Sequence, residues 1–262
     1  VGWATAALAA GLLAVPTFGA GFQLYTEGSA EALGQGGAIS ARTDMLSNTW
    51  YNPAALAGAE TKGLSLGLTL VKLSYTYDAG GPGGRQKLED DIHTIPHLNY
   101  VHPFSEEWTG MLSITVPYGL GTEWDKGYFR SLYNPANRVD FLTRPVLGLP
   151  HQTDFMAPYV TPSVGYKVND QLSLAAGLSV VQADVYLETM LHPAAGAPPP
   201  AGMGTREMEF RGDGYGFGYL LAAHYTLDEA WAFGALFHSS VNIDLEGETD
   251  LRRLGKADNI EA

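Results

Sequence analysis

Residues 214–226 read Gly-Tyr-Gly-Phe-Gly-Tyr-Leu-Leu-Ala-Ala-His-Tyr-Thr, and they carry the clearest pattern in the sequence. Large apolar side chains occupy every second position from Tyr215 to Tyr225, apart from Ala223. The positions between them hold small or polar residues, with Leu220 as the exception. Because successive side chains of a strand point to opposite faces, the pattern predicts a long strand with one apolar face and one small, polar face.

The same alternation recurs after residue 60, in residues 63–70, 108–118, 159–168 and 230–245. Strands of soluble proteins average about five or six residues, whereas a tilted strand needs about 9–11 residues to cross a membrane. Aromatic residues end several of the apolar faces, as expected where rings lie at the level of lipid headgroups. The sequence therefore predicts an all-β fold, a transmembrane antiparallel β-barrel. A soluble β-sandwich or lipocalin-like barrel is the alternative, although strands of this length with aromatic ends are atypical of it.

Two kinds of connection separate these stretches. Residues 168–171 and 227–229 are short turns rich in Asn and Asp, whereas residues 79–91, 123–158 and 192–205 are long loops. Outer-membrane barrels have short turns on the periplasmic side and long loops outside, so the pattern supports the barrel and predicts its orientation.

The alternation breaks between Leu70 and Val71 and again between Val180 and Val181. A β-bulge at either place would turn the later side chains to the other face. The alternative is that the strand leaves the membrane there, and the pattern does not choose between the two.

The composition excludes several functions. Only 16% of the 262 residues are charged and the formal net charge is −13, which disfavours binding to nucleic acid. The chain has no cysteine, so disulfides and Cys-ligated metals are excluded. The apolar run at residues 6–15 is too short to span a bilayer and precedes Pro16. Residues 1–19 therefore predict a signal peptide whose start is truncated, with a buried helix as the alternative.

No group of residues predicts an active site, a cofactor or a metal. Residues 63–67 match the Gly-x-Ser-x-Gly pattern of hydrolases, but they lie inside an alternating strand instead of a strand-to-helix turn. His93 and His97 share one face of a strand and His102 falls on the other, so a three-histidine metal site is not expected. We therefore expect a protein that is not an enzyme.

The long loop after residue 123 is unusually apolar for a segment outside the membrane. Exposed apolar patches usually mark binding, and the alternative is that these residues form a small core of the loop itself. The candidate groove consists of Tyr128, Phe129, Leu132, Tyr133, Phe141, Leu142, Val146 and Leu147. Arg130, Arg138 and Arg144 lie among them as candidate contacts for a carboxylate, or as partners of acidic residues in the same loop.

Several short segments resemble the FadL/TodX-type outer-membrane transporters. They are Ala-Gly-Phe-Gln-Leu at 20–24, Gly-Gln-Gly-Gly-Ala at 34–38, Asn-Pro-Ala at 52–54, Pro-Tyr-Gly-Leu-Gly-Thr-Glu-Trp at 117–124, and parts of 214–219 and 237–247. The resemblance implies a closed barrel of about fourteen strands with an N-terminal hatch inside its lumen. It implies that residues 20–60 form the hatch and residues 61–262 the first part of the barrel, with the C-terminal strands missing.

Functional residues follow from the same resemblance. Members of this family carry long-chain fatty acids or other hydrophobic compounds passively across the outer membrane of Gram-negative bacteria. The hatch would include Phe22, Gly36, Gly37, Asn52, Pro53 and Ala54. Lateral exit through the barrel wall would lie beside a kinked strand near Gly110, Pro117 and Gly119.

The expected partners are hydrophobic small molecules, membrane lipids and lipopolysaccharide, with the protein acting as a monomer. A structural or adhesive barrel without transport is the alternative within the membrane class, and a secreted soluble β-sandwich binding protein is the alternative outside it.

Overall fold

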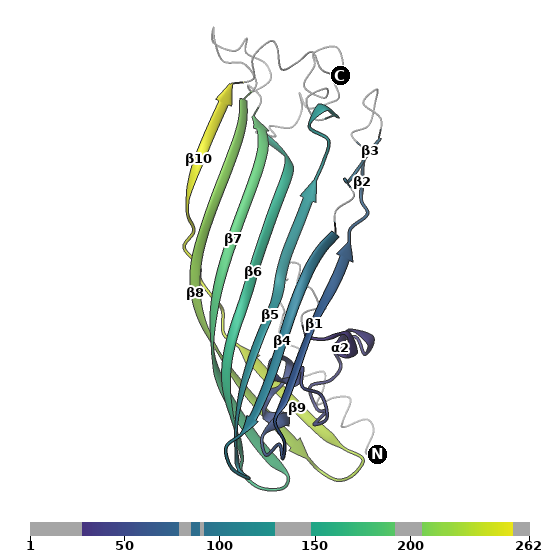
Figure 1. The fold of residues 1–262 in the computed structure, drawn as a ribbon, viewed down its shortest axis with the longest axis vertical. Coiled ribbons are helices and arrows are strands. Elements are labelled where there is room, and N and C mark those ends of the chain that lie inside the picture. The colour runs from purple at the N-terminus through teal and green to yellow at the C-terminus, as the bar shows by residue number, and fades with distance from the viewer. Residues whose placement is uncertain (1–27, 79–84, 90–91, 129–147, 192–205, 254–262) are drawn as a thin grey trace, which may run out of the picture.

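A computed structural model describes residues 28–78, 85–89, 92–128, 148–191 and 206–253. In this part of the chain, antiparallel strands form one eight-stranded sheet that curls like part of a barrel wall (Figure 1). A separate pair of short strands lies near one end of the long strands. This arrangement confirms the predicted all-β antiparallel fold.

The strands of the large sheet follow one another almost in chain order. They are β1 (Gly63–Lys72), β4 (Ile92–Pro103), β5 (Trp108–Glu123), β6 (Gly148–Lys167), β7 (Leu172–Leu191), β8 (Arg206–Thr226), β9 (Ala232–His238) and β10 (Glu246–Arg253). Both β9 and β10 pair with β8, and the short pair is β2 (Thr76–Asp78) with β3 (Arg85–Lys87). Within the described residues, three short helices precede the sheet: α2 (Ala30–Gly34), α3 (Asn48–Tyr51) and the 3-10 helix η1 (Pro53–Leu56). None of the helices in the described ranges is long and apolar enough to cross a membrane.

One face of the sheet, the outer face, is apolar and exposed. On β1, the side chains of Leu64, Leu66, Leu68 and Leu70 are between 59% and 66% exposed. On β8, exposed large apolar residues run from Tyr215 to Tyr225. Asp213, two residues before Tyr215, is also exposed on this face and marks the end of the apolar run. The run at 215–225 matches the roughly 9–11 residues that cross a bilayer, so the rest of β8 extends beyond it. The predicted alternation is confirmed.

The opposite, inner face is lined with small and polar side chains, and the N-terminal segment, residues 28–60, covers it near one end of the strands (Figure 1). Thr109, Ser163 and Ser179 are among the buried residues of this face. Helix η1 contacts β6, β7 and β8, and α3 contacts β4 and β5 (Figure 1). At Gly165, an added Cβ would lie 2.9 Å from the Cβ of Ala57, so the absence of a side chain lets the segment approach closely.

The short turns form as predicted, through side chains that accept backbone hydrogen bonds. The Asn169 side-chain oxygen accepts from the backbone N–H groups of Gln171 and Leu172 at 2.9 and 2.8 Å. Asp228 does the same for Ala230 and Trp231 at 2.8 and 2.9 Å. Asn and Asp are suited to such turns because their short polar side chains reach the backbone two or three residues ahead.

Two predicted loops are shorter than expected. Strand β6 already begins at Gly148, so residues 148–158 are strand and not the end of a loop. They extend the ladder in which Gly148 lies opposite Leu191. Residues 85–87 likewise form β3 inside the predicted loop at 79–91. The start of β6 pairs with the end of β7, far along the chain, and local sequence does not record that partner. Strand β3 pairs instead with the nearby β2, as the second strand of a local antiparallel pair.

The predicted strand at 230–245 is interrupted, because β9 ends at His238 and β10 begins at Glu246. Val241 and Ile243 instead pack against buried apolar residues on the inner face of the sheet. Added Cβ atoms at Gly216 and Gly218 would lie 2.5 and 2.8 Å from Val241. The glycines therefore leave the room into which this segment folds.

The two breaks in alternation have different causes. Strand β1 ends at Lys72, which agrees with a strand that stops and not with a bulge at Leu70 and Val71. At Val180 and Val181 the bulge is wrong, because the β7–β8 ladder runs without a shift from Leu172 to Leu191. On the outer face, exposed Val180 is followed by Gln182 and exposed Asp184, which agrees with a strand that leaves the membrane there while staying paired. Val181 is simply a fully buried apolar residue of the inner face.

Candidate functional site: the inner face and an opening in the sheet

Asn52 joins the N-terminal segment to the sheet. Its side-chain NH₂ donates to the carbonyl oxygens of Ser40 at 2.6 Å and Ala223 at 3.1 Å, and its side-chain oxygen accepts from the N–H of Ala54 at 3.2 Å. The side chain is fully buried. Pro53 holds Asn52 in an extended conformation, as predicted, and takes the first position of η1. Ala54 is also buried, so the Asn-Pro-Ala sequence forms one packed unit.

Polar side chains of the inner face provide further anchors. Asn99 on β4 donates to the carbonyl of Gly28 at 2.9 Å and accepts from the Thr49 hydroxyl at 2.7 Å. The His224 ring on β8 lies 3.1 Å from the carbonyl oxygen of Ala41. These contacts join backbone groups of the segment to side chains of the sheet, which satisfies buried polar groups on both sides.

Gly36 and Gly37 end helix α2. Their φ angles are +62° and +75°, a region that glycine adopts readily, and their N–H groups donate to Leu33 and Ala32. Nearby, Arg42 donates to Asp44, and this hydrogen bond holds the pKa of the Asp44 carboxyl below its ordinary value. Of the predicted hatch residues, Phe22 lies outside the described residues.

Aromatic rings line a small cavity of about 300 Å³ between the segment and the sheet. Trp50 meets Tyr159 edge-on at 5.5 Å between ring centroids and lies 4.7 Å from the His238 ring. Tyr118 lies 6.0 Å from Tyr159. Gly36 and Gly37 border the same cavity. Rings of this kind offer apolar contact on their faces and polar contact at their tips.

A larger hollow of about 740 Å³ is bounded by residues of β1, β4, β5, β6, β7 and β8. Val71, Ile95, Val116, Phe155 and Val185 give it apolar walls, and His93, Asp154, Asp184, Arg211 and Asp213 add polar groups at its border. Ligand sites commonly combine mostly apolar walls with a few polar groups that orient the ligand. The hollow is therefore a candidate binding space.

The hydrogen-bonded ladder between β4 and β5 is interrupted beside this hollow, and this interruption of the backbone pairing is called the opening below. The His93 ring of β4 lies across it, next to Gly121 of β5. The β4–β5 ladder runs from Pro103 and Thr109 to Leu98 and Ile114 and stops there. Residues 92–97 of β4 continue in pairing with β1, while β5 continues in pairing with β6. Farther along, the N–H of Glu89 donates to the carbonyl of Glu123 at 2.9 Å, which brings the chain back to β5. The opening therefore has backbone hydrogen bonds at both of its ends, the β4–β5 ladder at one and the Glu89–Glu123 bond at the other.

A local irregularity in β5 lies at the edge of this opening. The β5–β6 register shifts between Thr115 and Tyr118, so that two residues, Val116 and Pro117, face one residue of β6. Proline has no N–H to give a ladder, and an extra residue bends a strand. Gly119 borders the hollow. Gly110 lies instead in the regular ladder opposite His102, so the structure separates it from the other two predicted exit residues.

Only Tyr128 of the predicted capture groove lies among the described residues. It ends a helical turn after β5, its N–H donates to Asp125 at 2.9 Å, and its ring lies 6.3 Å from that of Tyr77. The other groove residues and the three arginines, at 129–147, lie outside the described residues.

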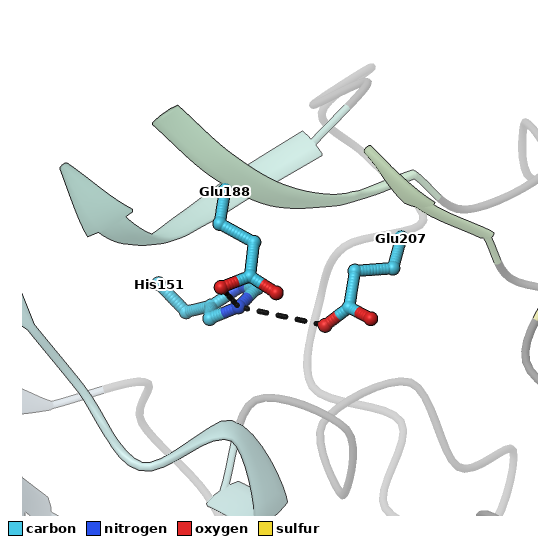
Figure 2. Close-up of side chains that lie close together, drawn as sticks. All are labelled: His151, Glu188 and Glu207. Carbon is cyan, nitrogen blue, oxygen red and sulfur yellow. Dashed lines mark ion pairs between the residues drawn. The ribbon is translucent and has the colours of Figure 1, made fainter. Parts of the chain in front are cut away.

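A buried polar cluster at the far end of the strands escaped the sequence analysis (Figure 2). His151 Nε2 lies 3.3 Å from Glu188 Oε2 and 3.8 Å from Glu207 Oε1. Lys126 Nζ lies 2.6 Å from Glu188 Oε1 and 3.7 Å from Glu207 Oε1. These residues are far apart in the chain, and only the registers of β6, β7 and β8 bring them together, so no local motif could have found them.

Charge pairing fixes the ionisation of this cluster, which lies beyond the apolar band of the outer face. Burial favours a raised pKa for Glu188, but its polar neighbours, first among them the hydrogen bond from Lys126, outweigh burial and lower the pKa to about 2. Burial likewise favours a lowered pKa for Lys126, but the hydrogen bond to Glu188 outweighs it and the pKa is raised. Both side chains are therefore charged at neutral pH.

Comparison with known proteins agrees with this geometry. The profile of a family described as outer membrane protein transport protein (OMPP1/FadL/TodX) matches residues 10–260. A long-chain fatty acid transport protein of Escherichia coli O6:H1 is 27% identical over 92% of this chain, and one of Salmonella typhi is 26% identical over 92%. The chain spans 55% of the length of each of these two relatives.

Solved structures show the same fold. A FadL homologue of Pseudomonas aeruginosa superposes with a TM-score of 0.63 at 22% identity, covering 92% of this chain and 56% of its own. The P. putida toluene transporter TodX gives 0.56 at 19% identity, covering 78% and 54%. The monoaromatic hydrocarbon channel CymD gives 0.63 at 17% identity, covering 88% and 57%. With its apolar outer face and a family profile matched over nearly its whole length, this chain belongs to the OMPP1/FadL/TodX family of outer-membrane transport proteins.

Proposed function

We propose that this chain forms part of a channel for passive uptake of long-chain fatty acids or other hydrophobic compounds. The observation that carries the proposal is the opening between β4 and β5 beside a hollow of about 740 Å³ with apolar walls. An opening in the wall gives an apolar molecule a route from the hollow into the bilayer without crossing water. The names of the relatives, which include fatty acid and monoaromatic hydrocarbon transporters, support this substrate class.

Capture of the substrate is assigned to the external loop after β5. Its apolar residues are Tyr128, Phe129, Leu132, Tyr133, Phe141, Leu142, Val146 and Leu147, and Arg130, Arg138 and Arg144 would meet a carboxylate headgroup. Each CH₂ that leaves water contributes about 0.8 kcal/mol, so a few apolar side chains hold a long acyl chain.

Passage requires the N-terminal segment to rearrange, and residues 20–60 act as its hatch. Of the three hydrogen bonds of Asn52, the one to the Ala223 carbonyl crosses to the sheet and would be exchanged for another in such a movement, whereas those with Ser40 and Ala54 lie within the segment. One such bond contributes about 0.5–1.5 kcal/mol net, so this anchor adds only a modest cost to the movement. Phe22, Gly36, Gly37, Pro53 and Ala54 complete the proposed hatch.

Exit takes place sideways at the opening. The bulge at Val116 and Pro117 keeps β5 from rejoining β4, and Gly119 leaves the border of the hollow free of a side chain. Gly110 would support the exit from the regular part of the strand. The apolar outer face lies against membrane lipid and lipopolysaccharide, and the protein functions as a monomer.

Uptake by living cells tests the proposal. Bacteria that lack their own transporter would express the intact protein, with residues 129–147 present or replaced by a short Gly-Ser linker. We expect the intact protein to restore uptake of radiolabelled oleate and the linker variant to lose most of it. Uptake that does not depend on the protein would contradict transport and favour an adhesive barrel. Equal uptake by the intact protein and the linker variant would contradict the capture role of the loop.

A further inference from the structure

His151, Glu188 and Glu207 form a buried cluster, and none of the three lines the hollow of about 740 Å³ (Figure 2). Its side chains are 0%, 5% and 11% exposed, and they come from the neighbouring strands β6, β7 and β8. One ligand atom from each, an imidazole nitrogen or a carboxylate oxygen, lies within 4.8 Å of the other two. Burying two carboxylates side by side is costly unless a cation accompanies them.

The spacing fits a metal ion. Zn²⁺ binds His nitrogen and carboxylate oxygen at about 2.0–2.2 Å, which places ligand atoms of a tetrahedral site about 3.3 Å apart. His151 Nε2 already lies 3.3 Å from Glu188 and 3.8 Å from Glu207, so these two distances differ from the tetrahedral spacing by a few tenths of an ångström at most. The two carboxylates offer oxygens within 4.8 Å of each other, so rotation of these side chains would complete the site. We propose that His151, Glu188 and Glu207 bind one divalent transition-metal ion, of which Zn²⁺ is the representative.

A cation already occupies the place between the carboxylates. Lys126 Nζ lies 2.6 Å from Glu188 and 3.7 Å from Glu207. Its side chain is 43% exposed and belongs to the helical turn after β5, so it can turn away into water. One ammonium balances only one of two carboxylates, whereas a divalent ion balances both. The metal and Lys126 therefore compete for the same site.

The ligand set also restricts the kind of ion. An imidazole together with two carboxylates suits Zn²⁺ and similar ions, whereas Ca²⁺ and Mg²⁺ prefer oxygen ligands alone. The Tyr186 hydroxyl donates to Glu188 Oε2 at 3.3 Å and orients this carboxylate, as outer partners of metal ligands commonly do. Bound metal would tie β6, β7 and β8 together beyond the membrane band, a role that goes beyond the proposed uptake.

Metal titration of the intact protein in detergent, after removal of metals with EDTA, tests the site. We expect Zn²⁺ to bind with one ion per chain in calorimetry, and Co²⁺ to give the visible absorption of a tetrahedral site. Glu188→Gln, Glu207→Gln and His151→Phe should each weaken Zn²⁺ binding about tenfold or more. Lys126→Met should strengthen binding severalfold because it removes the competitor. His102→Asn, in a histidine outside the cluster, should bind as the wild type does, and Ca²⁺ in excess should not displace Zn²⁺.

A cluster that is only a network of ion pairs gives a different result. Absence of Zn²⁺ binding in both the wild type and Lys126→Met would overturn the proposal, as would weaker binding in Lys126→Met. Equal binding by the wild type and a Glu188→Gln, Glu207→Gln double variant would also overturn it. Heat-modifiable migration on gels verifies that each variant is folded. Oleate uptake is measured separately, so failure of the metal site and failure of transport are distinguished.

Discussion

At the scale of single residues, Asn52 links the N-terminal segment to the sheet through Ala223 and joins parts of the segment through Ser40 and Ala54. Asn52→Ala removes its three hydrogen bonds and leaves the carbonyls of Ser40 and Ala223 without this donor. A buried polar group that loses its partner costs about 1–3 kcal/mol. We expect faster hydrogen exchange in residues 28–56, measured by mass spectrometry, with the barrel still assembled. Asn242→Ala, at an exposed position, serves as the matched control, and equal exchange in both variants would contradict the anchoring role.

Gly234 on β9 controls how closely the segment can approach. A Cβ at this position would lie 2.2 Å from the carbonyl oxygen of Ser40 and 2.8 Å from the side-chain nitrogen Nδ2 of Asn52. Gly234→Ala must therefore displace backbone, and we expect limited proteolysis to cut the segment severalfold faster. Gly34→Ala is the control, because nothing lies within 4 Å of its Cβ position. Unchanged cleavage of Gly234→Ala would show that the segment is loosely placed.

At the scale of elements, the sequence predicts strands and tight turns well and their interruptions poorly. The alternation at 214–226 and the turns at Asn169 and Asp228 depend on neighbours in the chain, and the structure confirms them. The break at residues 239–245 depends on the space that Gly216 and Gly218 of β8 leave for Val241. The buried cluster likewise depends on the registers of β6, β7 and β8, which local pattern does not contain.

The bulge in β5 is an element whose removal is informative. Deleting Pro117 leaves Val116 alone opposite one β6 residue, which restores an even ladder between Thr115 and Tyr118. We expect β5 to straighten and the opening beside β4 to narrow. Oleate uptake should then fall severalfold while the folded band on gels is retained. Pro162→Ala, at a proline in the regular part of β6, is the control. Normal uptake after the deletion would remove the lateral exit from the proposal.

At the scale of the whole molecule, two solvents act on opposite faces of one sheet. Lipid is the solvent of the outer face, and this explains why so many large apolar residues are exposed in a chain with few charges. The inner face meets a covering segment and polar space, so its side chains are small or hydrogen bonded. The alternation of the strands therefore follows from these two surroundings. The effect of a substitution should depend on the face of the sheet and on the depth of the residue in the membrane.

A charge placed on the outer face tests that statement. Leu178 is 67% exposed in the middle of the apolar band of β7, and Gln182 lies on the same face near the end of the band, opposite Tyr215. Arginine at mid-depth costs about 2–4 kcal/mol, but only about 0–1 kcal/mol near the interface. We expect Leu178→Arg to lower the urea concentration at which the lipid-inserted barrel unfolds, and Gln182→Arg to change it little. If both variants unfold together with the wild type, the outer face does not lie against hydrocarbon, and a water-facing sheet would have to take its place.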